Sequence, residues 1–325
     1  MTLLLGRADL ERLLDLDEVI DTVEAAFAAY SSGRTVTPPR GVVAPPGTGG
    51  VLLAMPCAIA EPPALGTKVV SVFGSNWPRG LSTVMSLYLL SDYQTGAPLA
   101  VMDGTYLTAI RTAAASAVAT RHLARAQART LGVFGTGVQA RFHVEAIGRV
   151  RPLERVLVVG TSPDKAVAFA RWVEEAAGLP AQPASPAAAS AADVVAACTT
   201  SPTPVVEAER VPAGAHLNAV GAFTPSTREL PTALITRARV YVDTRAGAGA
   251  EAGDLLIPVQ EGAFSLEAIT GEVGELVLGR VPGRRDEHEI TVYKSVGAAF
   301  LDAATARLAY ERAIARGAGQ SFTFA

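Results

Sequence analysis

The chain has 325 residues, of which 49% are hydrophobic and 18% charged, and its formal net charge is −3. This length allows two domains with large cores, and this composition is typical of a globular chain. The acidic balance argues against a nucleic-acid partner, and the lack of any run of about 18 uncharged apolar residues argues against a membrane span.

The amino terminus, the cysteines and the histidines favour a cytoplasmic protein without a metal. Acidic residues and arginines occur too early in the chain for a signal peptide. Cys57 and Cys198 lie far apart in apolar runs, which indicates buried thiols in a reducing compartment. The 4 histidines show no metal-ligand spacing, so we expect surface or helix-face positions for them and no metal site.

The first third of the chain predicts helices around a set of short strands. Apolar residues recur at intervals of three and four over 10–30, which predicts one helix. Beyond this helix, short apolar segments alternate with turn residues in the manner of an antiparallel meander. An alanine-rich helix is expected over 108–126, and the boundary between two domains is expected inside or beside it. The strand segments are Val42–Ala44, Val51–Met55, Thr67–Phe73, Thr83–Leu90 and Pro98–Met102.

The segment 130–159 carries the pattern of a dinucleotide-binding unit. An apolar run ends at the turn Gly135-Thr136-Gly137-Val138-Gln139-Ala140, an amphipathic helix pattern follows, and a second apolar run closes the unit. Gly135 permits the tight turn, and Gly137 lets the backbone approach a pyrophosphate. The helix N-terminus then offers free N–H groups to the phosphates. The alternative is the same turn without a ligand.

The chain beyond residue 159 predicts further strands of the same sheet. The segment 183–192 is rich in Ala, Ser and Pro and is expected to be a loop beside a short strand. The segment 247–253 is expected to be mobile and to border the cofactor. A final helix over 296–315 is expected to return to the first domain. The strands are expected at Ala191–Cys198, His216–Val220 and Val240–Asp243.

Three cations in structured segments are candidates for holding a substrate carboxylate. Lys68 precedes a strand-like apolar run, where a charge is costly unless it is paired. Arg111 starts the helix at the domain boundary, and Arg40 follows the break at Pro38–Pro39. Arginine offers the two-pronged geometry that a carboxylate fits. The alternative for each is a solvated or salt-bridged base.

The end of the second strand of the dinucleotide unit predicts the choice of cofactor. NAD-selective sites place Asp or Glu there to hold the ribose 2′-hydroxyl. Here the strand ends at Val159-Gly160-Thr161-Ser162, and the two hydroxyls can donate to a phosphate. Asp164 comes later and is expected to cap the next helix. We therefore expect NADPH in preference to NADH, with NADH possible.

Several motifs that occur in order along the chain carry a family resemblance, namely Gly66–Ser71, Asp103–Gly104 with Thr108–Ala114, Gly135–Ala140, Asn218–Ala222 and Lys294–Gly297. On these motifs the chain resembles the ornithine cyclodeaminase/mu-crystallin family over nearly its whole length. The resemblance implies a homodimer whose N-terminal strands build the subunit interface. We therefore expect an α/β fold, with a Rossmann dinucleotide-binding domain over 116–299. An N-terminal α+β substrate-binding and dimerisation domain over 1–115 would be completed by the C-terminal helix in 300–325.

The resemblance also implies roles for individual residues. Lys68 and Arg111 would be catalytic, and together with Arg40 and Thr83 they would bind the substrate carboxylate. The residues expected to contact the cofactor are Gly135, Thr136, Gly137, Val138, Gln139, Thr161, Ser162, Thr199, Val220, Gly221 and Ser295.

One departure from the family decides which activity is expected. Cyclodeaminases that resemble this chain carry an Asp shortly after the run 218–221, where it serves the amino group of ornithine. Phe223 stands at that position, and it can neither accept a proton nor hydrogen-bond an ammonium. An apolar wall beside the nicotinamide suits a flat cyclic imine as substrate, as in the ketimine reductases that the segment 221–230 resembles. The alternative is that Glu229 substitutes as the base.

The resulting hypothesis is an NAD(P)H-dependent reductase of a small cyclic imino acid. It would convert Δ1-pyrroline-2-carboxylate to L-proline or Δ1-piperideine-2-carboxylate to L-pipecolate, mostly by positioning and electrostatics. The alternatives are an ornithine cyclodeaminase, an amino-acid dehydrogenase, and a non-catalytic protein that binds NADPH and a small ligand.

Overall fold

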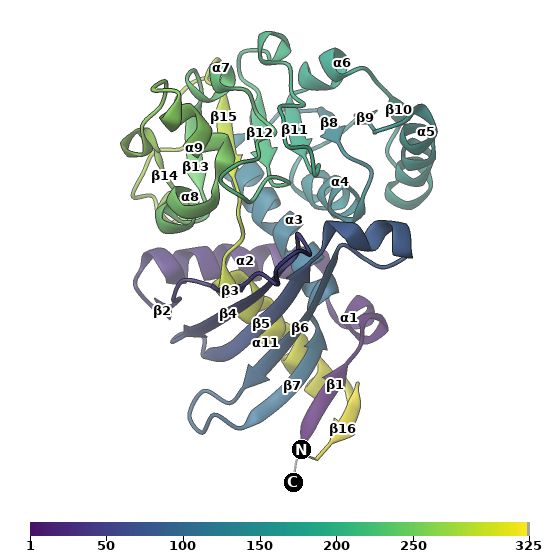
Figure 1. Ribbon diagram of the computed structural model, residues 1–325, viewed down its shortest axis with the longest axis vertical. Helices are drawn as coiled ribbons and strands as arrows, with labels where there is room; N and C mark the ends of the chain where they lie inside the picture. The colour runs from purple at the N-terminus through teal and green to yellow at the C-terminus, as the bar shows by residue number, and fades with distance from the viewer. Residues whose placement is uncertain (324–325) are drawn as a thin grey trace. The chain divides into compact units, whose positions relative to one another are not determined.

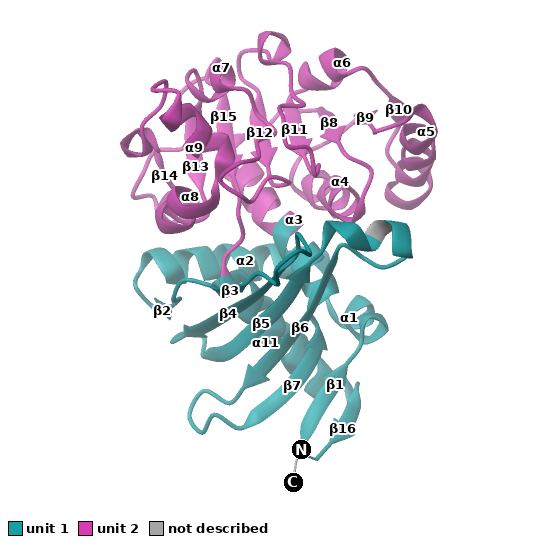
Figure 2. Ribbon diagram, in the orientation of Figure 1, with its two compact units in different colours: residues 1–112, 299–325 teal, residues 113–298 magenta. Residues whose placement is uncertain are grey.

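The computed structural model describes residues 1–323, except for the side chain of Trp77. The chain divides into two compact units, unit 1 (Met1–Thr112 with Ala299–Ala325) and unit 2 (Ala113–Ala298), as Figure 2 shows. The first division lies three residues before the expected end of the first domain at 115, and the second lies one residue before 300. Within residues 1–323, no helix is both long and apolar enough to cross a membrane.

Unit 2 is built on one sheet of eight strands, whose order is β10-β9-β8-β11-β12-β15-β13-β14 (Figure 1). All of these strands pair in parallel. The chain enters at β8, and the strand order reverses between β8 and β11. The strands are β8 (Thr130–Phe134), β9 (Arg155–Val159), β10 (Ala181–Pro183), β11 (Val194–Ala197), β12 (His216–Ala219), β13 (Arg239–Val242), β14 (Gly271–Glu272) and β15 (Thr291–Lys294).

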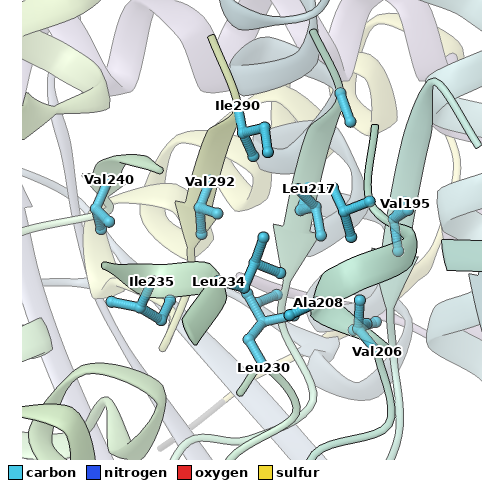
Figure 3. Packing of buried hydrophobic residues seen from close by; sticks show 14 of the residues in the cluster. Val195, Val206, Ala208, Leu217, Leu230, Leu234, Ile235, Val240, Ile290 and Val292 are labelled. Carbon is cyan, nitrogen blue, oxygen red and sulfur yellow. The ribbon is translucent and has the colours of Figure 1, made fainter. Parts of the chain in front are cut away.

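Helices cover both faces of this sheet, because its central strands are apolar on both faces. Along β11, Val194 and Ala196 belong to one hydrophobic cluster, whereas Val195 and Ala197 belong to the other. Figure 3 shows the second cluster, in which Val195 and Leu217 of the sheet lie near Leu234. The helices of unit 2 are α4 (Val138–Val150), α5 (Pro163–Trp172), η2 (Val173–Ala177), α6 (Pro186–Ser190), η3 (Ala208–Arg210), α7 (Thr232–Ile235), α8 (Arg245–Glu251), α9 (Gly253–Gln260), η4 (Leu266–Ala268) and α10 (Val273–Val277). This doubly wound parallel sheet confirms the expected Rossmann-type α/β fold.

Two segments of unit 2 contain short helices that are capped locally, and in the first of them a helix stands where a loop was expected. The expected strand near 183 is β10, but the expected loop contains α6, which Ser185 caps by accepting from the Ala188 N–H at 3.2 Å. The segment 247–253 contains the end of α8, Ala252 and the start of α9, and its expected mobility and its place beside the cofactor remain predictions. Thr244 caps α8 by accepting from the Gly247 N–H at 3.0 Å. A side-chain oxygen at the N-cap satisfies helix N–H groups and so stabilises even short helices.

Unit 1 contains a second sheet, of mixed direction. Its path is β16-β1-β7-β6-β5-β4-β2, and β3 also pairs with β4. The run from β4 to β7 is the expected antiparallel meander. The edge strand β16 is not anticipated by the sequence pattern, and neither is β1, which lies between β16 and β7 and pairs in parallel with β7. The strands are β1 (Thr2–Leu5), β2 (Thr35–Val36), β3 (Gly41–Val43), β4 (Val51–Ile59), β5 (Ala64–Val72), β6 (Val84–Ser91), β7 (Pro98–Asp103) and β16 (Gln320–Phe322).

One face of this sheet is covered by helix α11 (Ala299–Arg316), the expected C-terminal helix, which packs on β4, β5 and β6. The ring of Phe300 stacks on Tyr30 of α2 (Leu16–Ser31) with 4.7 Å between centroids. The N-terminal segment expected to be one helix is two, α1 (Arg7–Leu13) and α2. Asp15 interrupts the helical pattern because its carboxylate caps α2, accepting from the N–H groups of residues 17 and 18. The remaining helices are η1 (Gly74–Arg79) and α3 (Gly104–Leu123), which continues into unit 2.

Candidate active site

The predicted cofactor residues lie at the carboxyl ends of the parallel strands of unit 2. The turn 135–139 follows β8, residues 161 and 162 follow β9, and Thr199 follows β11. Val220 and Gly221 follow β12, and Ser295 follows β15. Ligands of open parallel sheets bind outside these strand ends, at the point where the strand order reverses, which here is between β8 and β11.

The glycine turn after β8 fits a dinucleotide. Gly135 has a φ of +108°, and a Cβ on it would lie 2.6 Å from the carbonyl oxygen of Cys198, so only glycine is accommodated. A Cβ on Gly137 would meet no atom within 4 Å, which leaves open space above the first turn of α4. Gly137 is the N-cap of α4 and supplies no side-chain hydrogen bond, so the first N–H groups of the helix are available to an anion.

The two residues that follow Gly137 are an exposed apolar side chain and an amide with an unpaired oxygen. Val138 is 57% exposed at the first position of α4. Gln139 buries its side-chain Oε1, which has no hydrogen-bond partner in the described part of the chain. An unpaired buried amide oxygen is costly unless a ligand or water meets it. These features are compatible with a bound nucleotide at this turn.

The end of β9 differs in one respect from the sequence-based expectation. Ser162, and not Asp164, caps α5, since its hydroxyl accepts from the Lys165 N–H at 3.4 Å. Lys165 also donates from Nζ to the Thr161 hydroxyl oxygen at 3.3 Å. Both hydroxyls are therefore engaged by Lys165, and its ammonium stands beside Thr161. The sequence-based prediction did not include this lysine.

Glu229 holds together the strand ends at which Thr199 and Gly221 lie. Its Oε1 accepts from the N–H and the hydroxyl of Thr199 at 2.6 and 2.8 Å. Its Oε2 accepts from the N–H groups of Gly221 and Ala222 at 2.7 and 3.3 Å. Burial raises the pKa of this carboxyl, against the opposing charge of Lys294. With both oxygens engaged by the protein, Glu229 is not available as a base for a substrate amine.

A buried ion pair holds the backbone on either side of Phe223, at Ala222 and Glu229. Lys294 Nζ lies 2.7 Å from Asp254 Oδ2, and both side chains have no exposure. Lys294 also donates to the carbonyl oxygen of Ala222, and Asp254 Oδ1 accepts from the Glu229 N–H at 2.7 Å. Phe223, which follows Ala222, is half-buried. The residue expected as an apolar wall thus stands next to a segment whose backbone is fixed by buried charges.

Ser295 is placed by the carboxylate of Asp243, at the end of β13. The Asp243 Oδ2 accepts from the Ser295 hydroxyl at 3.0 Å and from the N–H groups of residues 296 and 297 at 2.7 Å each. The Ser295 side chain is buried and its hydroxyl proton is committed to Asp243. Its expected contact with the cofactor therefore remains a prediction. Such a contact could use the backbone of Ser295 or the lone pairs of its hydroxyl oxygen.

In unit 1, the structure brings two of the three predicted cations together on one carboxylate. Lys68 Nζ lies 2.7 Å from Asp302 Oδ2, and Arg111 Nε lies 2.8 Å from Asp302 Oδ1. The exposed fractions of Lys68, Arg111 and Asp302 are 2%, 4% and 0%. Arg111 Nη1 has no hydrogen-bond partner among the described residues. The structure therefore buries two cations, one anion and an unused guanidinium donor in one place.

The electrostatics of this cluster follow from its burial. Burial lowers the pKa of Lys68 to about 8, although Asp302 acts to raise it and Arg111 and Arg40 lower it further. Burial opposes ionisation of Asp302, but the two cations outweigh it and lower the pKa of Asp302. Lys68 lies in the middle of β5 and not before it, and Arg111 lies within α3 and not at its start. Both positions differ slightly from the sequence-based prediction.

The other two predicted substrate residues, Arg40 and Thr83, each lie directly before a strand of unit 1. Arg40 precedes β3 and is half-buried, and its charge acts to lower the pKa of Lys68. Thr83 precedes β6, and its carbonyl oxygen accepts from the Phe73 N–H at 2.8 Å. Asp302 was missed by the sequence analysis. The available signal was an acidic residue between the apolar positions 299, 303 and 306 of the C-terminal helix.

Among the remaining titratable candidates, His143 serves a structural role. His143 is buried between the Ser116 hydroxyl and the Gln139 carbonyl, at 2.9 and 2.7 Å, and is thus in the core rather than on the surface. Cys57 and Cys198 are free thiols. No group of three or more potential metal-ligating side chains occurs in residues 1–323.

Fold and site together define a dinucleotide-binding protein of the Rossmann class with a separate unit that carries a buried cation cluster. The family model described as "Ornithine cyclodeaminase/mu-crystallin family" matches residues 1–317. The chain belongs to this family, as its motifs indicate.

Similar proteins with named activities match along almost the whole chain. The Δ1-pyrroline-2-carboxylate reductase of Bacillus thuringiensis subsp. konkukian is 40% identical over 325 residues, covering 99% of this chain and 100% of the relative. The solved structure of Thermococcus litoralis Δ1-pyrroline-2-carboxylate reductase with NADH and L-proline has a TM-score of 0.97 at 39% identity, covering 99% and 100% of the two chains. An archaeal alanine dehydrogenase dimer with bound NAD has a TM-score of 0.94 at 35% identity, covering 99% of each chain.

Proposed function

We propose that this protein reduces the C=N bond of cyclic 2-imino carboxylates, converting Δ1-pyrroline-2-carboxylate to L-proline or Δ1-piperideine-2-carboxylate to L-pipecolate with NAD(P)H. The observation that carries the proposal is the buried cluster of Lys68, Arg111 and Asp302. One carboxylate neutralises only one of two cations. When both cations are ionised, the buried cluster therefore has a net charge of one positive unit. A buried unpaired charge is costly, and a substrate carboxylate would neutralise it.

The chemistry assigns distinct tasks to the residues of the cluster. Arg111 uses Nε for Asp302, which leaves the unpartnered Nη1 to hold the substrate carboxylate. Lys68 would keep the imine nitrogen protonated and so make its carbon electrophilic. When bound, the reduced nicotinamide supplies the hydride. Phe223 offers no base, so the site would not deprotonate a substrate amine.

We expect NADPH to bind more tightly than NADH. No carboxylate follows β9 within 159–162, and the ammonium of Lys165 stands beside Thr161. A 2′-phosphate would be favoured by this cation and disfavoured by a carboxylate. Titration of the protein with each cofactor, followed by nicotinamide fluorescence, measures the preference. Lys165→Gln should weaken NADPH alone, and an equal effect on both cofactors would exclude a 2′-phosphate contact.

We propose that the protein is a homodimer formed through the uncovered face of the unit 1 sheet. Rows of paired residues on β4, β5 and β6 point away from α11, and one of them joins Ala54, Val69 and Leu87. Val69 and Leu87 are 41% and 60% exposed, and Leu52, Met85 and Leu89 add to the same face. Contiguous exposed apolar surface of this kind marks a protein interface.

A cytoplasmic location belongs to the same proposal. Cys57 and Cys198 remain free thiols, which is usual in a reducing compartment.

A panel of substrates tests the proposed activity. We expect NADPH oxidation with the five-membered or six-membered cyclic imine, and no release of ammonia from ornithine. The similarity to alanine dehydrogenase makes amino-acid dehydrogenase the second candidate, so pyruvate with ammonia belongs in the panel. Turnover of pyruvate and ammonia alone would favour that candidate. Binding of NADPH without reduction of any substrate would favour a non-catalytic ligand-binding protein.

A further inference from the structure

Asp302 comes from a part of the chain remote from the two cations that it binds. It lies on α11, whereas Lys68 lies on β5 and Arg111 on α3. Its two oxygens are divided between them, with Oδ2 accepting from Lys68 at 2.7 Å and Oδ1 from Arg111 at 2.8 Å. A single carboxylate therefore fixes the positions of both cations.

The way in which Asp302 engages Arg111 matters for a second carboxylate. Asp302 accepts from Nε, on the side of the guanidinium, and Nη1 remains without a partner although it is buried. An arginine whose only task was to stabilise the core would be expected to satisfy its buried donors. The orientation set by Asp302 thus leaves Arg111 Nη1 available to a second acceptor.

We infer that Asp302 is a positioning residue of the reductase, which keeps Lys68 as an ammonium and turns Arg111 so that Nη1 receives the substrate carboxylate. The inference rests on the proposed function, because it assigns these two tasks to Lys68 and Arg111. Asp302 itself has no exposure and both of its oxygens are occupied, so it acts through the two cations and does not touch substrate.

The groups around Lys68 define what the loss of Asp302 would do. They are Asp302 of α11, Arg111 of α3, Arg40 before β3, and Cys57 and Tyr88 on the strands β4 and β6 that flank β5. Of these, Asp302 alone carries a negative charge near neutral pH, because burial raises the pKa of Cys57 to about 11 and the pKa of Tyr88 well above its usual value. Asp302→Asn removes that charge, so Lys68 should lose its proton at lower pH.

The pH dependence of kcat/KM for the cyclic imine tests this inference, with the whole chain and saturating NADPH. Wild type should lose activity as pH rises through about 8, the pKa of Lys68. In Asp302→Asn this falling limb should move at least about one pH unit lower, which corresponds to a roughly tenfold change in proton affinity. Glu311→Gln, on an exposed part of the same helix, should leave the limb in place. An unmoved limb in Asp302→Asn would overturn the inference.

Asp302→Glu provides a second test if the asparagine variant does not fold. It retains the charge but displaces it, so the falling limb should stay near that of wild type while KM for the imine rises about tenfold through misplacement of Arg111. An unchanged KM would contradict the positioning role.

A titration that needs no turnover separates this inference from the proposed function. The chain has only three lysines, Lys68, Lys165 and Lys294, so lysine side-chain NMR signals can be assigned by single substitutions. The Lys68 midpoint should fall in Asp302→Asn, whether or not any imine is reduced. If the midpoint falls but wild type reduces no imine, the electrostatic role of Asp302 stands and the proposed function fails.

Discussion

Replacement of Arg111 tests the central claim about substrate recognition. Arg111→Ala removes the guanidinium whose Nη1 is unpartnered and leaves Lys68 and Asp302 as a neutral pair 2.7 Å apart. The cluster then has no net charge, so it no longer attracts a substrate carboxylate electrostatically. Truncating one partner of a buried charged hydrogen bond costs roughly 2–5 kcal/mol. Since about 1.4 kcal/mol is tenfold, kcat/KM for the cyclic imine should fall by about 30-fold to 4000-fold.

The assay is NADPH oxidation with varied imine, accompanied by titration of NADPH binding and a thermal melt. We expect NADPH affinity to be unchanged, because Arg111 lies in unit 1 and the glycine turn lies in unit 2. Arg121→Ala, an exposed arginine of the same helix, is the matched control and should retain activity. If Arg111→Ala is folded and keeps kcat/KM within about threefold of wild type, a loss of less than roughly 0.7 kcal/mol, the carboxylate role is refuted.

Three further predictions concern the cofactor, the pH dependence of stability and the dimer. In Gly137→Ala the added Cβ meets no neighbouring atom, so the free energy of unfolding should change by less than about 1 kcal/mol. NADPH affinity should fall about tenfold, because one phosphate contact is lost. Unchanged affinity would place the phosphates elsewhere. Burial lowers the pKa of His143 to about 4 and of His216 to about 3. Both take up a proton more readily when unfolded, so the free energy of unfolding in urea should fall below about pH 6.5, by up to about 1.4 kcal/mol per pH unit for each; a flat profile between pH 6.5 and 5 would contradict the burial. Leu87→Asp should convert a dimer to a monomer in light scattering, whereas Val167→Asp, at an exposed position on α5, should not. A monomeric wild type would exclude the interface.

Much of the dinucleotide unit could be predicted because its signals are local. The φ of +108° at Gly135 and the open space above Gly137 follow from a strand, a turn and a helix within about 30 residues. The helix break at Asp15 and the capping of α5 by Ser162 were not predicted correctly, although they are local as well. Periodicity does not reveal which of several polar residues a helix uses as its cap.

The sequence by itself determined that Lys68 needs a partner, that Phe223 offers no base, and that a glycine turn opens a parallel sheet. Only the tertiary structure decided which carboxylate is the partner, because Asp302 is 234 residues away from Lys68 in the chain. It also decided that Glu229 is engaged by backbone N–H groups from two strand ends. Local propensity is determined by neighbouring residues, whereas the pairing of buried charges depends on which distant elements the hydrophobic core brings together.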